Sequence, residues 1–377
     1  MREIYLNNSA TSWPKPPGLA DHIKGIIENI PVSHGRSDSY SEDDTDHILN
    51  TRNKIADFFC VKDPSDIIFT SGATHGLNML IRDEVINGDV ITSVTEHNAV
   101  LRPLKVLEDK TVHYIECDQN AFVDTDALKK RITEKVTHVV INHASNVTGT
   151  LQNIDKIYKI VRDQGKELII DASQSAGSAE IDISLYSEAA WIFTGHKGLM
   201  GLPGAGFSYI PPHYDIPAFI MGGNGVMSEL EHMPPQRPLK YEAGTMNISG
   251  IASIGYGLSF IRKTGLEKII KHKRNLHAML VDILSQTDNI NISGAVNSAV
   301  NTGVVAFEHD TIPSDEFCDM LGQGFGIHCR CGLHCAPEIH RSLGTFENGL
   351  IRVSPSWFTT EDEIEYFAEA VKKICRR

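Results

Sequence analysis

Short apolar runs alternate with polar or amphipathic stretches throughout residues 65–210. This alternation is the pattern of strands joined by helices in a parallel α/β sheet. The expected strands are residues 67–70, 89–92, 112–115, 138–141, 168–170, 191–193 and 206–210. Open α/β sheets bind ligands at the carboxyl ends of their strands, where helix N-termini and free N–H groups collect. We therefore expect the chemistry at that edge.

The rest of the chain predicts a second, smaller domain. Residues 211–244 are rich in Pro, Gly and Met, which indicates a long loop, and a helical pattern resumes at 248–262. A helix opened by Ser314, a strand at 350–353 and a closing helix from Thr360 follow. The expected division is an N-terminal segment packing near the small domain and active site, a large domain and a small C-terminal α+β domain, at residues 1–15, 16–247 and 248–377.

Composition excludes several classes of protein. A formal net charge of −13 disfavours nucleic acid as a partner, because unspecific binding needs a surplus of Lys and Arg. No apolar run approaches the roughly 20 residues that span a bilayer, and the N-terminus lacks the pattern of a secretion signal. Seven scattered cysteines do not form a disulfide framework. We expect a cytoplasmic protein with free thiols and no membrane partner.

Two residues at predicted strand ends are candidates for cofactor chemistry. Lys197 lies in Thr-Gly-His-Lys-Gly directly after an apolar run, although most lysines are simply solvated. Asp171 ends another run, where a carboxylate can pair with a protonated pyridine nitrogen, although an Asp there is more often a turn or helix cap. Residues 70–74, Thr-Ser-Gly-Ala-Thr, offer hydroxyls and helix-start N–H groups for an anion.

Together with further motifs in the same order, these residues give a resemblance that runs nearly end to end. The chain resembles fold-type I pyridoxal-phosphate (PLP) enzymes of the class V aminotransferase group, in the short-loop branch of the cysteine desulfurases and selenocysteine lyases. The matching segments are residues 5–12, 95–100, 142–149, 171–174, 194–197 and 242–245. The resemblance implies a large PLP-binding domain with a mostly parallel seven-stranded sheet.

The resemblance also implies roles around the cofactor ring. Lys197 would hold PLP as a Schiff base and act as the base, and Asp171 would pair with the pyridine nitrogen. Gln174 and Asn146 would bond the ring-oxygen side, and His97, also a catalytic candidate, would stack on the ring. The alternative for His97 is a helix-start histidine bonded to nearby backbone.

The phosphate would be held by a separate set of residues. By resemblance these are Thr74 with the Ala73 backbone, Thr194, His196, and Thr245 arriving from the neighbouring subunit. A homodimer with shared active sites follows from that implication. No metal ligand is expected.

A second motif implies sulfur chemistry. Residues 330–337 resemble the Arg-x-Gly-x-x-Cys-Ala loop, whose last cysteine, here Cys335, attacks the substrate sulfur. Arg352 would clamp the substrate carboxylate, with Asn146 and Ala10 as further substrate contacts. A thiolate is the nucleophile and needs help from a cation, a helix N-terminus or a polar cleft, and Arg330, His334 and a helix starting near Pro337 could provide this help.

The implied activity is removal of sulfur from L-cysteine to give L-alanine and a Cys335 persulfide, passed on to a protein sulfur acceptor. Alternatives are a selenocysteine lyase acting on L-selenocysteine, another PLP-dependent C–S lyase, or a non-catalytic sulfur-trafficking module. A zinc-type site is a further alternative, although the spacing lacks a paired Cys-x-x-Cys; its ligands would come from His328, Cys329, Cys331, His334 and Cys335.

Four positions depart from the family pattern. Ser39 stands where a His is usual, Ser71 replaces a common Arg, Ala73 a common Thr, and Asn98 a frequent second His.

Cysteine is among the most buried residue types, so structural roles are expected for Cys60, Cys117, Cys318 and Cys375.

Overall fold

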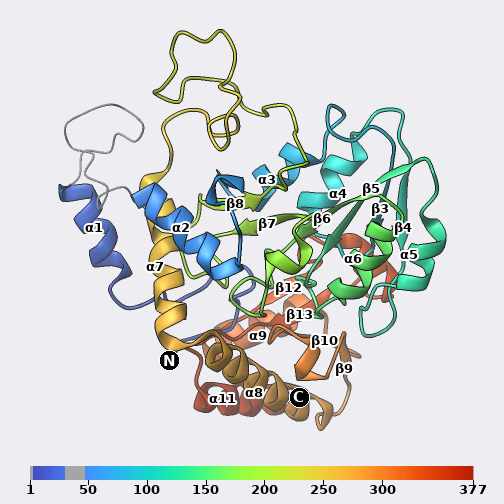
Figure 1. Cartoon of the computed structure of the whole chain (residues 1–377). Helices are drawn as coiled ribbons and strands as arrows, with labels where there is room; N and C mark the ends of the chain where they lie inside the picture. Colours follow the sequence, from blue (N-terminus) through green and yellow to red (C-terminus); the bar gives the residue numbers. More distant parts are fainter. Residues whose placement is uncertain (1–2, 30–46, 377) are drawn as a thin grey trace.

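The computed structural model describes residues 3–29 and 47–376, and its centre is a seven-stranded sheet (Figure 1). The strand order is β2-β8-β7-β6-β5-β3-β4. The bounds are β2 (Ile67–Thr70), β3 (Asp89–Ser93), β4 (Val112–Ile115), β5 (Val136–Asn142), β6 (Glu167–Asp171), β7 (Ala190–Thr194) and β8 (Gly206–Tyr209). β8 runs antiparallel to β2 and β7, and the other pairs are parallel. The predicted mostly parallel α/β sheet is confirmed, and each expected run lies in one strand except that β8 ends one residue earlier than expected, at Tyr209.

The central strands of the sheet are buried on both faces, which explains the nearly continuous apolar runs in β6 and β7. In β6, Leu168 and Ile170 face one core, and Ile169 faces the other. The first core includes side chains of α2 (His47–Phe59), α5 (Thr125–Arg131), α6 (Ile154–Asp163) and α7 (Ile248–Thr264). The second includes side chains of α3 (Ala73–Leu80) and α4 (Asn98–Lys105).

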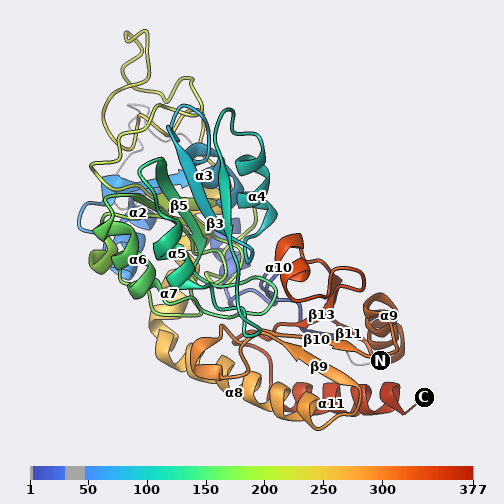
Figure 2. The ribbon, with the colours of Figure 1, turned by 90° about the vertical axis from the view of Figure 1, so that its right-hand side faces the viewer.

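The small domain is a four-stranded antiparallel sheet covered by helices (Figure 2). Its order is β12-β13-β10-β9, with bounds β9 (Ile290–Ser293), β10 (Val305–His309), β12 (Arg330–Gly332) and β13 (Leu350–Val353). Its apolar core adds side chains of α8 (Leu266–Ser285), α9 (Ser314–Phe325) and α11 (Glu361–Cys375). The capping box between Thr360 and Glu363 starts α11 where the sequence predicts it. The expected smaller α+β part is therefore confirmed.

The N-terminal segment links the two domains. β1 (Ile4–Tyr5) pairs in parallel with β11 (Ile327–His328) of the small domain, and the Ser12 N–H donates to the His196 carbonyl of the large domain at 3.0 Å. α1 (Leu19–Asn29) and α2 then pack on α7, whose apolar side chains join the large-domain core. The boundary at residue 248 stays a prediction. Every helix in the described ranges is too short or too polar to cross a bilayer.

Candidate active site

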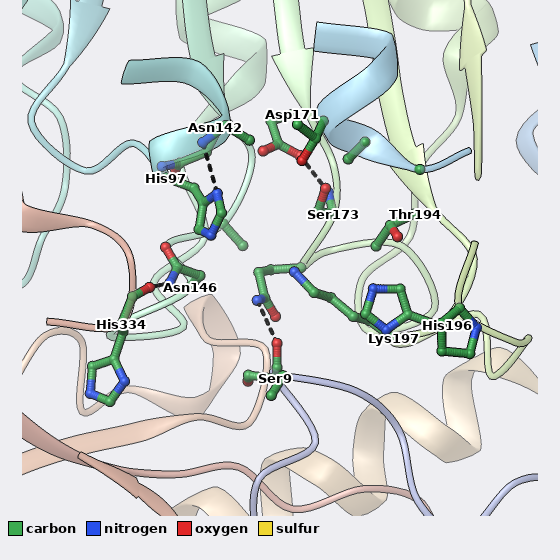
Figure 3. A pocket seen from close by; sticks show the side chains of 18 of the residues that line it. Ser9, His97, Asn142, Asn146, Asp171, Ser173, Thr194, His196, Lys197 and His334 are labelled. Carbon is green, nitrogen blue, oxygen red and sulfur yellow. Dashed lines mark hydrogen bonds between the residues drawn. The ribbon is translucent and has the colours of Figure 1, made fainter. Parts of the chain in front are cut away.

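A cavity of about 370 Å³ lies where β5, β6 and β7 end. Asn142, Asp171 and Thr194, the last residues of these strands, line it together with Arg330 and Arg352 of the small domain. Figure 3 shows His97, Asp171, Thr194 and Lys197, from separate segments of the large domain, around one space. The cavity brings together most of the predicted residues: Ala10, Ala73, Thr74, His97, Asn146, Asp171, Gln174, Thr194, His196, Lys197 and Arg352.

Lys197 follows β7 in a turn that the N-terminal segment fastens. The His196 carbonyl accepts from the Ser12 hydroxyl at 3.0 Å and from the Lys15 ammonium at 3.1 Å. The Thr11 hydroxyl lies 3.1 Å from Nδ1 of His196. Burial lowers the pKa of Lys197 to about 8, and the Asp171 carboxylate opposes that shift. A substantial fraction of Lys197 is therefore neutral amine near pH 8, the form that acts as nucleophile or base.

The carboxylate of Asp171 is 6% exposed and is fixed by its own turn. Its Oδ1 accepts from the Ser173 N–H at 2.9 Å. The strand end places the group on the cavity wall, in the same cavity as Lys197 (Figure 3). It can stabilise a positive charge in the cavity without leaving its hydrogen bond.

His97 is the N-cap of α4. Its Nδ1 accepts from the Ala99 N–H at 3.0 Å, so the proton of the neutral ring is on Nε2. Burial, followed by the charge of Lys197, lowers the pKa of His97 to about 4. The backbone bond considered for His97 is present, and the ring also lines the cavity. The two interpretations are compatible.

Amide and hydroxyl groups on the same wall have unused bonding capacity. The Asn146 side-chain N–H donates to the His334 carbonyl at 2.7 Å, whereas Asn146 Oδ1 is buried without a partner. The Ser173 hydroxyl is also buried without a partner. Gln174 donates to the Ser9 carbonyl at 3.0 Å. Buried polar atoms without partners are costly, so these atoms are suited to a bound ligand.

The far end of the cavity is suited to an anion. α3 begins after Gly72, which has no side chain to cap the first N–H groups of the helix. Ala73 and Thr74 supply those first groups, and Thr194 and His196 line the same cavity. Thr245 is exposed and does not line the cavity of its own chain. Ser39 lies outside the described residues.

Two arginines approach from the small domain. Arg352 is 1% exposed and donates to the Asn146 carbonyl at 2.7 Å and to Asn7 Oδ1 at 3.0 Å. Burial, followed by the charge of Arg330, lowers the pKa of Arg352 to about 9. In the described ranges no carboxylate lies within 4.0 Å of either guanidinium. Such a pair of unneutralised cations attracts a carboxylate ligand.

Cys335 does not line the cavity, although its neighbour His334 and its contact Arg330 do. Its carbonyl accepts from the Asn98 N–H at 2.7 Å, and Arg330 Nη2 lies 3.4 Å from its Sγ. Cys335 and His334 have φ angles of 60° and 50°, a left-handed conformation that is strained for such residues. The loop is thus held in an uncommon shape with the thiol beside a cation.

The zinc alternative gains no support from the described part of the chain, where no group of three or more His, Cys, Asp or Glu side chains could hold a metal ion. His334 is buried and bonds the Leu350 carbonyl through Nε2. His328 instead contacts Glu3 through Nε2. Cys318, expected to be merely structural, lies with its Sγ 3.3 Å from that of Cys329.

The sequence did not single out several residues that line the cavity: Ser9, His75, Asn142 and Ser173. Ser9, Asn142 and Ser173 lie inside the recognised motif segments, and His75 follows Thr74 directly. Three of these four cavity-lining residues therefore belong to segments that the motifs had marked. Which side chains point inward depends on the local backbone.

Comparisons with known proteins find relatives that match nearly the whole chain. The model of the aminotransferase class-V family matches residues 4–367. A probable cysteine desulfurase of Methanothermobacter thermautotrophicus is 27% identical over 98% of this chain and 94% of its own length, and one of Pyrococcus abyssi is 28% identical over 99% and 94%. The apo structure of cysteine desulfurase from Thermococcus onnurineus NA1 superposes with a TM-score of 0.91 at 26% identity, covering 99% of this chain and 95% of that one.

Proposed function

The chain belongs to the aminotransferase class-V family, and from this premise we propose that it is a PLP-dependent cysteine desulfurase. The proposed reaction converts L-cysteine to L-alanine and leaves the sulfur as a persulfide on Cys335. The observation that carries the proposal is one cavity that holds Lys197 and Asp171 and is flanked by two arginines and a cysteine. Assignment to the short-loop branch stays a prediction from residues 330–337.

The residues in the cavity fit PLP. The cofactor has an aromatic ring, a phenolic oxygen, a pyridine nitrogen and a phosphate. The buried Asn146 Oδ1 and Ser173 Oγ have no partner, and the start of α3 has no capping side chain. A ligand with a polar ring and an anionic end would satisfy these groups. When bound, PLP supplies an electron sink for a carbanion at the substrate Cα.

Each side chain has a role in this arrangement. Lys197 would hold the cofactor covalently, and the Asp171 carboxylate would keep a proton on the pyridine nitrogen. The neutral ring of His97 would cover one ring face. Asn146 and Gln174 would bond the oxygen side.

The anionic end would be held by helix-start and strand-end groups. Ala73 and Thr74 supply backbone N–H groups of α3, and Thr194 and His196 line the same cavity. We assign cofactor binding to residues 16–247 and the sulfur-accepting loop to residues 248–377. Residues 1–15 would close the site at the turn of Lys197.

The chain's own groups also carry the substrate steps. Arg352 and Asn146, with Ala10 nearby, would bind the amino-acid end of the substrate. The neutral amine of Lys197 would remove the Cα proton and deliver a proton at product release. The thiolate of Cys335 would form a bond to the substrate sulfur as the Cβ–S bond breaks, which leaves the extra sulfur on Cys335.

Incubation of the holoenzyme with L-cysteine and a dithiol tests this function. We expect equal amounts of alanine and sulfide from the wild type. Cys335→Ala should lose at least about a hundredfold of sulfide release while it keeps the visible absorption of a lysine-bound Schiff base. Cys60→Ala, at an exposed position in the large domain, is the matched control. Undiminished sulfide release by Cys335→Ala would contradict the proposal, and a marked preference for L-selenocysteine would redirect it to a selenocysteine lyase.

We also propose a homodimer in which each subunit completes the site of the other. Thr245 is exposed and outside its own cavity, and Phe219, Ile220 and Met221 on the preceding loop are exposed apolar residues. A partner subunit would cover this loop, and Thr245 would enter the partner's cavity at the end that holds the cofactor phosphate. Mixing Lys197→Ala with Thr245→Ala subunits should restore activity, because one of the two hybrid sites is intact.

The persulfide sulfur on Cys335 must be passed to an acceptor, and the Cys335 thiol must be kept reduced. We propose a protein thiol as the acceptor of the persulfide sulfur. Because each turnover requires a reduced Cys335, we propose a cytoplasmic location for the enzyme.

A further inference from the structure

Three cysteines from separate elements meet behind the loop that carries Cys335. Cys318 lies on α9, Cys329 between β11 and β12, and Cys331 on β12. The Sγ atoms of Cys318 and Cys329 are 3.3 Å apart, and all three thiols are half-buried. α9 packs directly on β11 and β12, so the contact is part of the helix–sheet interface.

Two of the three thiols have raised pKa values. The hydrogen bond with Cys329, followed by burial, raises the pKa of the Cys318 thiol. Burial, followed by the charge of Cys318, raises the pKa of Cys331 to about 11. Either thiol can donate in the contact between Cys318 and Cys329, so each sulfur has the other within reach.

We propose that Cys318 and Cys329 are a redox-active dithiol that a peroxide converts to a disulfide. A disulfide needs an S–S distance of about 2.05 Å, so the two sulfurs must approach by about 1.3 Å from their 3.3 Å separation. Both side chains are already in contact. A rotation of one side chain supplies such a movement.

The oxidation balances in two steps. One of the two sulfurs, for example that of Cys329, attacks one peroxide oxygen, the O–O bond breaks, and this cysteine becomes a sulfenic acid while water or an alcohol leaves. The thiol of the other cysteine then attacks that sulfur, the S–O bond breaks, and a second water leaves with the thiol proton. Two thiols have lost two electrons, and the peroxide has gained them.

The pair is separate from the sulfur-accepting residue of the proposed function. Arg330 contacts Cys335, whereas its neighbour Cys331 extends to the opposite side of β12, toward Cys318. The inference therefore stands whether or not the chain is a desulfurase. A disulfide would fasten α9 to the residue that precedes Arg330.

Peptide mapping of the holoenzyme can test the pair. The protein is treated with a small excess of hydrogen peroxide, alkylated and cleaved after Lys and Arg. Residues 275–330 contain no internal Lys or Arg, so Cys318 and Cys329 stay in one peptide, and Cys331 and Cys335 lie in the next one, 331–341. We expect peptide 275–330 to lose two hydrogens, to resist alkylation, and to recover after reduction with a dithiol.

Matched variants decide the assignment. Cys318→Ser should leave Cys329 open to alkylation or single-residue oxidation, and Cys375→Ser, at a half-buried cysteine on α11, should leave the linkage intact. A peptide 275–330 that carries two alkyl groups after peroxide treatment would overturn the proposal. A cross-link to peptide 331–341 would equally overturn it, since the bond would then involve Cys331 or Cys335.

Discussion

The guanidinium of Arg330 lies 3.4 Å from the Sγ of Cys335 and has no carboxylate partner among the described ion pairs. Strand β12 sets the position of the arginine, and the Asn98 N–H fixes the carbonyl of the cysteine. The cation is thus placed to stabilise a thiolate.

Replacing Arg330 should slow the reactions of Cys335. We expect Arg330→Gln to lower the rate of iodoacetamide alkylation of Cys335 at pH 7 by about threefold to tenfold, because a nearby positive charge is lost. Tandem mass spectrometry of a chymotryptic digest, which does not depend on Arg330 or Arg341, gives the rate at Cys335 separately from Cys331. Arg341→Gln, at an exposed position on α10 (Pro337–Ser342), is the control, and an equal loss there would argue against a local effect.

Arg352 should act mainly on substrate affinity. We expect Arg352→Lys to raise KM for L-cysteine by about tenfold or more with a smaller change in kcat, because lysine cannot make the two-pronged contact of a guanidinium with a carboxylate. Steady-state kinetics separate the two constants. Arg131→Lys, on the exposed end of α5, should match the wild type, and an unchanged KM in Arg352→Lys would remove the residue from the substrate site.

The buried carboxyl group of Glu96 should make the stability of the protein depend on pH. The side chain is fully buried, and burial raises its pKa from 4.5 to about 8. Between these values the folded protein keeps a proton that the unfolded chain has lost, so stability falls as pH rises. The free energy of unfolding of Glu96→Gln, relative to the wild type, should increase by on the order of a few kcal/mol between pH 5 and pH 8. Above pH 8 the difference should stay constant.

Urea unfolding at several pH values measures this difference. Glu369→Gln, at an exposed position on α11, should show no such trend. A constant difference across the range would mean that Glu96 does not titrate in it.

The ion pair between Arg52 and Glu242 should stabilise the segment before Thr245. Arg52 Nη2 lies 2.8 Å from Glu242 Oε2, and the Phe69 N–H donates to Oε1 at 2.7 Å. Glu242→Ala should lower the free energy of unfolding by about 3–5 kcal/mol, because it leaves a buried charge unpaired. Calorimetry or urea unfolding measures the loss.

A double substitution separates the energy of the ion pair from the energy of the packing around it. Replacing both Arg52 and Glu242 by Met should cost less than the sum of the two single replacements, since no charge is left alone. Glu229→Ala, in the exposed loop, is the control. Additive losses would mean that the two charges do not interact.

The sequence by itself determined the sheet and the position of the site. A sheet covered on both faces favours apolar residues on both sides of a strand, so strands such as β2, β6 and β7 appear as nearly continuous apolar runs. Asp171 and Lys197 follow two such runs, and parallel strands bring their ends to one edge whatever the distance along the chain. These features depend on local pattern and on strand direction.

Only the tertiary structure decided which side chains meet. The contact between Cys318 and Cys329 depends on how α9 packs on the small sheet, and the bond from Asn98 to Cys335 depends on how the two domains dock. Neither leaves a periodic signal in the sequence. Likewise, Thr245 lies within a recognised motif, yet the fold of one chain keeps it out of its own cavity, because its place is set by packing between segments far apart.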